Sequence, residues 1–160
     1  GSVDEPIGRH PQHRTRMAVV ASGRPAITHY RVLERFPAHS LLAVNLETGR
    51  THQIRVHMAH LRHPVFGDQV YGGRLHLPAG ASEGLKQVLR GFKRQALHAK
   101  RLQLLHPVSG RPMRFECAMP ADMRAVVDAL AADANIHWQD PGYEDYAGFD
   151  DFDEYDEDED

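Results

Sequence analysis

A strand, a tight turn and a helix follow one another without a break between residues 42 and 61, and no other stretch constrains the fold as strongly. The strand is predicted by an alternation of apolar with smaller or polar residues, the apolar positions being Leu42, Val44 and Leu46. Thr48-Gly49 then predicts a sharp turn, because glycine adopts backbone conformations that a side chain resists.

The helix after this turn is expected over residues 51–62, with Pro64 ending it. Its apolar stripe is defined by the spacing of Ile54, Met58 and Leu61. A helix N-terminus presents unpaired N–H groups and partial positive charge, and two arginines lie beside it here. Such a corner suits a carboxylate or a phosphate. The polar residues of the corner are Arg50, His52, Gln53 and Arg55.

Residues 49–55 resemble the Gly-Arg-x-His-Gln-Ile/Leu-Arg motif of the RluA-type RNA pseudouridine synthases, especially the RluD branch that modifies large-subunit ribosomal RNA. The resemblance continues in His63–Gly73, returns at Arg94–Ala99 and His106–Gly110, and covers roughly residues 3 to 135. Several motifs in the right order are far more specific than any one alone.

The resemblance implies that residues 3–138 are the C-terminal part of a pseudouridine synthase catalytic domain. It implies large-subunit ribosomal RNA as partner, and an upstream half of the domain with an N-terminal RNA-binding module in the parent chain. It implies no cofactor. Gly1-Ser2 has the look of a cloning scar, and residues 139–160 are expected to form an acidic disordered tail.

Pseudouridine formation breaks a glycosidic C–N bond and rejoins the base through carbon, work suited to a buried carboxylate. The family carries this aspartate in a His-Arg-Leu-Asp motif, which does not occur here. Asp68 instead matches a family loop and is expected to brace a turn. We therefore predict that the 160-residue chain is inactive without the upstream motif.

By the resemblance, Arg55 is the arginine that pairs with the absent catalytic aspartate. Ile54 matches the apolar residue against which the target base packs. Arg50 and His52 are expected to contact RNA phosphate or to brace the turn, and Gln53 is expected to bind the RNA substrate.

The remaining sequence predicts an α+β fold with a largely antiparallel sheet and packed helices. Residues 3–16 are interpreted as an irregular basic arm that either contacts RNA or is only a solvated linker. The expected elements are strands at 17–21, 27–36 and 39–47, helices around 51–62 and 85–92, a hairpin of 96–105 with 112–118, and a last helix from Pro120.

The net charge of −3 conceals two opposite parts of the chain. Residues 140–160 hold 12 of the 22 acidic residues and no Lys or Arg, so residues 1–139 carry a net charge of +9. A body this basic is typical of a protein that binds a polyanion. No apolar run approaches the roughly 18 residues of a membrane span. Cys117 alternates with apolar neighbours and is interpreted as a core residue in a reduced compartment, which indicates the cytoplasm.

Two alternatives stay open beside the synthase interpretation. One is a stand-alone RNA-binding module without catalysis. The other is a metal-dependent hydrolase built on the histidine row His57, His60 and His63. No acidic residue lies among these histidines and the His-Glu-x-x-His pattern is absent, so no metal site is expected, and an RNA-phosphate or helix-capping role is favoured for them.

Overall fold

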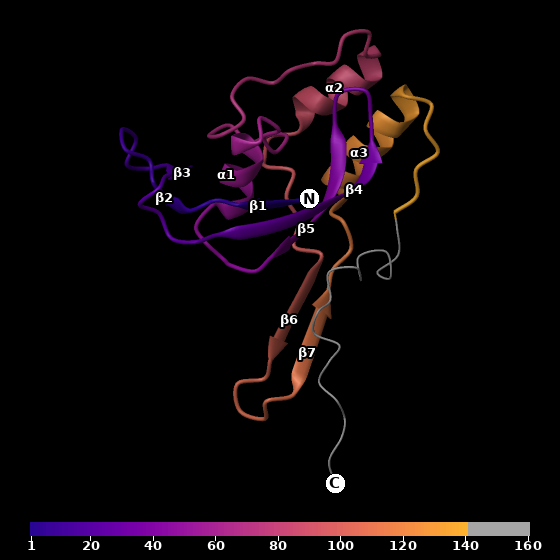
Figure 1. Cartoon of the computed structure of the whole chain (residues 1–160). Helices are drawn as coiled ribbons and strands as arrows, with labels where there is room; N and C mark the ends of the chain where they lie inside the picture. The colour runs from indigo at the N-terminus through magenta and orange to yellow at the C-terminus, as the bar shows by residue number, and fades with distance from the viewer. Residues whose placement is uncertain (141–160) are drawn as a thin grey trace.

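The computed structural model describes residues 1–140 as an α+β fold with antiparallel sheets and three helices, as the sequence predicted (Figure 1). The predicted disorder of the acidic tail falls outside the described residues, apart from Gln139 and Asp140. The elements are β1 (Ser2–Asp4), β2 (Ile7–Arg9), β3 (Met17–Val19), β4 (Ile27–Arg35), β5 (Ser40–Leu46), α1 (Gln53–His60), α2 (Glu83–Gly91), β6 (Arg101–Leu105), β7 (Pro112–Glu116) and α3 (Ala121–Asp133).

The central sheet has the order β1-β4-β5 with both pairings antiparallel, and Thr28 lies opposite Val3 on one side and Leu46 on the other. The sequence predicted one meander of strands at 17–21, 27–36 and 39–47. The last two pair as predicted, but the first strand is not part of this sheet. β3 pairs with β2 instead. β2 and β3 are consecutive strands and form a hairpin, and the turn after β3 packs directly on β2, since a Cβ at Gly23 would lie 2.5 Å from the carbonyl carbon of Ile7.

The predicted irregular arm over residues 3–16 is also wrong in its first half, where residues 3–4 and 7–9 lie in β1 and β2. Val3 and Ile7 are buried in β1 and β2, with exposed fractions of 4% and 2%. The two apolar side chains are separated by polar residues and a proline, so no alternation marked them as strands. Only the loop between β2 and β3, residues 10–16, keeps the irregular and basic character that the sequence indicated.

α1 is shorter than the predicted 51–62 by two residues at each end. His52 has a left-handed backbone with φ of 58°, and Arg62 has φ of 63°, so neither continues the helix. α2 begins where Ser82 accepts a hydrogen bond from the Leu85 N–H at 3.2 Å, an N-cap. No helix among residues 1–140 is long and apolar enough to cross a membrane.

Two separate hydrophobic clusters hold these elements together. The larger joins the β4–β5 turn to α2 and α3, and its centre includes Phe36, Leu89 and Val127. The smaller packs α1 against β2 and β3 through Val56 and Ile7. Arg55 and Tyr71 lie beside this second cluster, whereas residues of the larger cluster line the main cavity described below.

The β6–β7 hairpin extends away from both clusters (Figure 1). Its register sets Leu102 opposite Phe115, and these two side chains are 55% and 49% exposed. Cys117, just beyond β7, is exposed as well, so its interpretation as a core residue is wrong. The apolar alternation did predict the strand, but the described part of the chain does not cover its apolar face.

Candidate functional site

The turn before α1 is held in place by the buried side chain of Gln53. Its Oε1 accepts hydrogen bonds from the Thr48 hydroxyl at 2.8 Å and the Arg50 N–H at 2.9 Å. Its Nε2 donates to the Ile27 carbonyl at 2.9 Å and to the Thr28 hydroxyl oxygen at 3.0 Å. Gln53 is 3% exposed, and the amide thus joins the turn to β4. This geometry argues against the expected RNA contact by Gln53.

His57 continues the same polar network into the core. It is fully buried, with Nδ1 2.8 Å from the Thr28 hydroxyl and Nε2 2.9 Å from the Glu5 carbonyl. In the neutral ring, Nε2–H donates to that carbonyl while Nδ1 accepts from Thr28. The expected role of the histidine row at RNA phosphate or as a cap is therefore wrong for His57.

The same contacts bear on the hydrolase alternative. Both ring nitrogens of His57 are already bonded to protein groups, so metal binding there requires breaking a buried hydrogen bond. Across residues 1–140, no group of three or more His, Cys, Asp or Glu side chains is placed to hold a metal ion. The absence of a metal cofactor stays a prediction.

Arg55 projects from α1 onto Asp68, the residue that the motif comparison had assigned to a turn. Nε donates to Oδ2 at 2.7 Å and Nη2 donates to Oδ1 at 3.0 Å, a two-pronged pairing. The side chains are 11% and 0% exposed, respectively. The two bonds use Nε and Nη2 and do not involve Nη1.

Asp68 also braces its own turn, as the sequence predicted. Its Oδ1 accepts from the backbone N–H groups of Val70 at 2.9 Å and Tyr71 at 3.1 Å. Burial by itself raises the pKa of Asp68, but the hydrogen bonds from Arg55 and these N–H groups outweigh burial and hold the pKa below its ordinary value. The pair is therefore ionised at neutral pH.

Tyr71 lies over this ion pair and connects it to β3. The Arg55 guanidinium carbon is 4.8 Å from the centre of the Tyr71 ring, a cation–π contact. The Tyr71 hydroxyl accepts from the Met17 N–H at 3.0 Å and lies 2.9 Å from Nδ1 of His52. Burial and the Arg55 charge lower the pKa of His52, which favours a neutral ring at this contact.

The other predicted site residues lie around this centre. Arg50 is half-buried and its Nε donates to the Pro25 carbonyl at 3.0 Å. His52 is exposed on the left-handed turn. Ile54 is half-buried and lines a cavity of about 920 Å³, which Asp68 also borders. The cavity lies between β4–β5, α1, the loop after α1, and the α2–α3 pair.

Sequence reasoning missed the pairing of Arg55 with Asp68 and the whole role of Tyr71. One signal was available for the first, because Asp68 is the first acidic residue after Arg55 in the chain. A buried guanidinium needs a carboxylate, and a search along the chain reaches Asp68 before any other. Nothing in the sequence pattern indicated that Tyr71 lies beside the N-terminus of α1.

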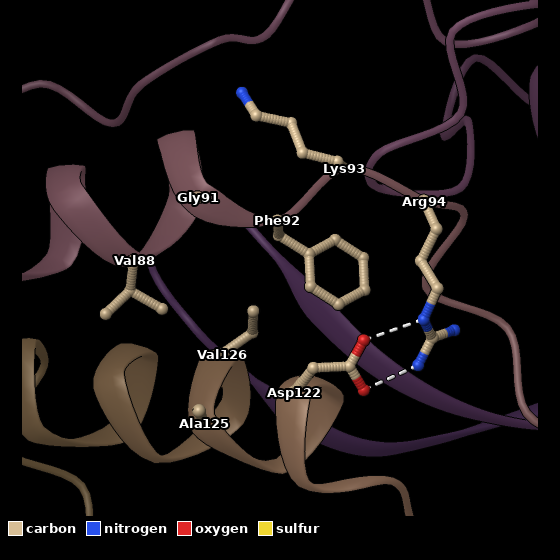
Figure 2. A pocket seen from close by; sticks show the side chains of 8 residues that line it. All are labelled: Val88, Gly91, Phe92, Lys93, Arg94, Asp122, Ala125 and Val126. Atoms are coloured by element: carbon tan, nitrogen blue, oxygen red, sulfur yellow. Dashed lines mark hydrogen bonds and ion pairs between the residues drawn. The ribbon is translucent and has the colours of Figure 1, made fainter.

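A second ion pair of the same type lies elsewhere, beside a smaller cavity between α2 and α3. Asp122 accepts two hydrogen bonds from Arg94, at 2.7 Å each. Figure 2 shows this pair beside the Phe92 ring. The guanidinium carbon of Arg94 is 5.2 Å from the ring centre. The cavity measures about 460 Å³, and none of the predicted site residues lines it.

Comparison with known proteins gives the family. The profile described as RNA pseudouridylate synthase matches residues 1–60. The ribosomal large subunit pseudouridine synthase D of Pasteurella multocida is 55% identical over 143 residues, and that of Escherichia coli K12 is 56% identical over 137. This chain belongs to the RluA-type RNA pseudouridine synthase family. The identities place it in the RluD branch, as the motifs indicated.

These alignments cover 89% and 86% of the chain but 44% and 42% of the relatives. The chain thus spans less than half the length of the curated relatives it matches. The fold also resembles a solved structure of the human RNA pseudouridylate synthase domain containing 1, with a TM-score of 0.65 at 24% identity. That match covers 92% of this chain and 58% of the human chain, and it supports the fold alone.

Proposed function

We propose that this chain is the arginine-bearing part of an enzyme that isomerises uridine to pseudouridine in large-subunit ribosomal RNA. Arg55 carries the proposal. It matches the family arginine, is largely buried at the start of α1, and is fixed in a single orientation by Asp68. Such a guanidinium is ready to hold a second carboxylate through Nη1 and to keep it ionised.

The second carboxylate is the family's catalytic aspartate, which we place in a part of the protein upstream of this chain. Asp68 does not take that role, because it already accepts four hydrogen bonds from Arg55 and its own turn. Ile54 would supply the apolar wall on which the extruded base rests. Arg50 and His52, at the edge of the same corner, would contact the RNA backbone.

The RNA assignment is supported by the loop between β2 and β3. Its basic side chains, together with Arg9 at the end of β2, are exposed or half-buried, and they are His10, His13, Arg14 and Arg16. The first residue of β3, Met17, is tied to Tyr71 and hence to the Arg55 centre. The loop thus places positive charge within reach of RNA bound at the site. Ribosomal RNA as substrate would also place the protein in the cytoplasm.

An upstream half of the catalytic domain is supported by the β6–β7 hairpin. One face of the hairpin carries only apolar side chains, which are Leu102, Leu104, Met113 and Phe115. A two-stranded hairpin with an open apolar face is marginal by itself in water. The part that matches this chain is 44% of the Pasteurella relative, so more than half of that relative lies outside the match. We assign this face to the upstream half, which in the parent chain would follow an N-terminal RNA-binding module.

Tritium release from 5-tritiated uridine in a ribosomal RNA transcript tests the proposal. The complete enzyme, meaning this chain with its upstream half, should release tritium, and the 160-residue chain alone should not. Turnover by the 160-residue chain would contradict the assignment of the aspartate to the upstream half. A complete protein that binds the transcript but releases no tritium would favour the RNA-binding module instead.

A further inference from the structure

The Arg55 guanidinium is held from two directions by residues of one short segment, 68–71. Asp68 holds it in plane, since its two oxygens accept from Nε and Nη2 at 2.7 and 3.0 Å. The Tyr71 ring holds it from the face, at 4.8 Å from the guanidinium carbon. A guanidinium fixed both in plane and against one face has little rotational freedom left.

The segment itself is fixed by contacts that leave it little room to shift. Asp68 bonds the N–H groups of Val70 and Tyr71, and the Tyr71 hydroxyl bonds both β3 and His52. The backbone packs just as closely, because a Cβ at Gly67 would lie 1.9 Å from the Arg94 carbonyl oxygen. Gly67 also has φ of 75°, which a side chain disfavours. The segment is thus a rigid support rather than a loose surface loop.

We propose that Asp68 and Tyr71 are positioning residues that orient Arg55 for the carboxylate it must hold, rather than residues that only stabilise the fold. The proposal rests on the proposed function, because it takes Arg55 as part of the active site. An active site depends on groups held close to their productive geometry, and a displacement of about 1 Å can cost 100-fold in rate. Both residues act through Arg55.

The chain contains its own control for this idea. Arg94 is also held in plane by a carboxylate, Asp122, and against the face of a ring, Phe92 (Figure 2). That group joins the segment after α2 to α3 and borders the smaller cavity, and only its ring, Phe92, also lines the cavity of Ile54 and Asp68. Breaking it removes an ion pair of the same two-pronged geometry without touching Arg55, although this pair is more exposed, at 38% and 50% against 11% and 0%.

The test compares four variants of the complete enzyme, two at each group: Asp68→Asn, Tyr71→Leu, Asp122→Asn and Arg94→Ala. Tritium release gives kcat and the KM for the RNA transcript, and thermal unfolding shows which variants are folded at the assay temperature. Asp68→Asn should lower kcat about 100-fold, and Tyr71→Leu about 10-fold, with KM within about threefold of the wild type. The two control variants should keep both constants within about threefold, whatever they lose in melting temperature.

A second measurement does not depend on activity. The Nε–H group of Arg55 gives its own NMR signal, which a strong hydrogen bond shifts and protects from exchange with water. Asp68→Asn should abolish that protection for Arg55 and leave it unchanged for Arg94, and Asp122→Asn should do the reverse.

The outcomes separate this inference from the proposed function. A wild-type complete enzyme without activity contradicts the proposed function. An active wild type whose Asp68→Asn and Tyr71→Leu variants keep kcat within threefold overturns the positioning role. Equal losses in the control variants overturn it too, because they show that fold stability alone sets the rate. If Asp68→Asn does not fold, the kcat of Tyr71→Leu is compared with that of the control variants by the same criterion.

Discussion

Arg55 and Asp68 form a two-pronged ion pair between α1 and the loop that follows it, with bonds of 2.7 and 3.0 Å. The carboxylate is fully buried and the guanidinium is 11% exposed. Removing either partner leaves the other charge without compensation in a poorly hydrated site. The pair therefore links the fold of this region to any chemistry that Arg55 performs.

Replacement of Arg55 should abolish most catalysis in the complete enzyme. Arg55→Ala should lower kcat by at least about 100-fold, because the catalytic carboxylate loses its charged partner. Arg55→Lys should rescue little, since an ammonium lacks the planar fork that can bond two carboxylates. Tritium release measures both, with Arg94→Ala as the matched control. Near-normal rates for Arg55→Ala would show that Arg55 is only structural.

The stability that Asp68 contributes should depend on pH in one direction. Its pKa in the folded chain lies below the ordinary value of 3.8, so the unfolded chain binds the proton more tightly. The contribution is complete above pH 3.8 and is lost as the pH falls through the lowered pKa. Urea unfolding from pH 7 downward should show a stability gap between wild type and Asp68→Asn that is constant near neutrality. The gap should shrink below about pH 4. A gap that does not narrow in acid would contradict the ionised pair.

Gln53 should matter for stability rather than for RNA. Its amide fills four hydrogen bonds inside the protein, so Gln53→Ala leaves several buried groups unpaired and should lower the free energy of unfolding by about 3 kcal/mol. The exposed Gln69 provides the control, and Gln69→Ala should change the free energy by less than about 0.5 kcal/mol. RNA affinity, measured where both variants are folded, should match the wild type. If folded Gln53→Ala bound RNA more weakly than the wild type and Gln69→Ala did not, the predicted RNA contact by Gln53 would be supported.

The acidic tail should compete with RNA for the basic body. Asp140, its first acid, already lies 3.1 Å from the Lys100 ammonium. Residues 140–160 carry 12 negative charges on a body of +9, and a tethered polyanion acts at high effective concentration. A chain ending at Trp138 should therefore bind RNA more tightly than the full chain at low salt, with the difference closing at high salt. Equal affinities at low ionic strength would mean that the tail is only a solubility segment.

The sequence alone predicted the strand–turn–helix stretch, the two later helices, the hairpin and the family, and each depends on local information. Alternation, helical spacing and turn residues act between neighbours in the chain, so they can be recognised without knowing the fold. The family could be predicted because each of its motifs is a short run of residues that is read directly from the chain. The helix ends were less well predicted, because His52 and Arg62 leave the helix through left-handed backbones that their residue types do not suggest.

Only the tertiary structure decided which strands pair and what the site residues touch. β3 pairs with β2, Gly23 lets the turn after β3 lie directly against Ile7, and β1 takes the place beside β4 that the periodicity had given to β3. Gln53 and His57 occupy the buried face of α1, although their polarity indicated the surface, because Thr28 and nearby carbonyls satisfy them. Such partners lie more than 20 residues away in the chain. No local pattern encodes these contacts, which depend on how the whole chain folds.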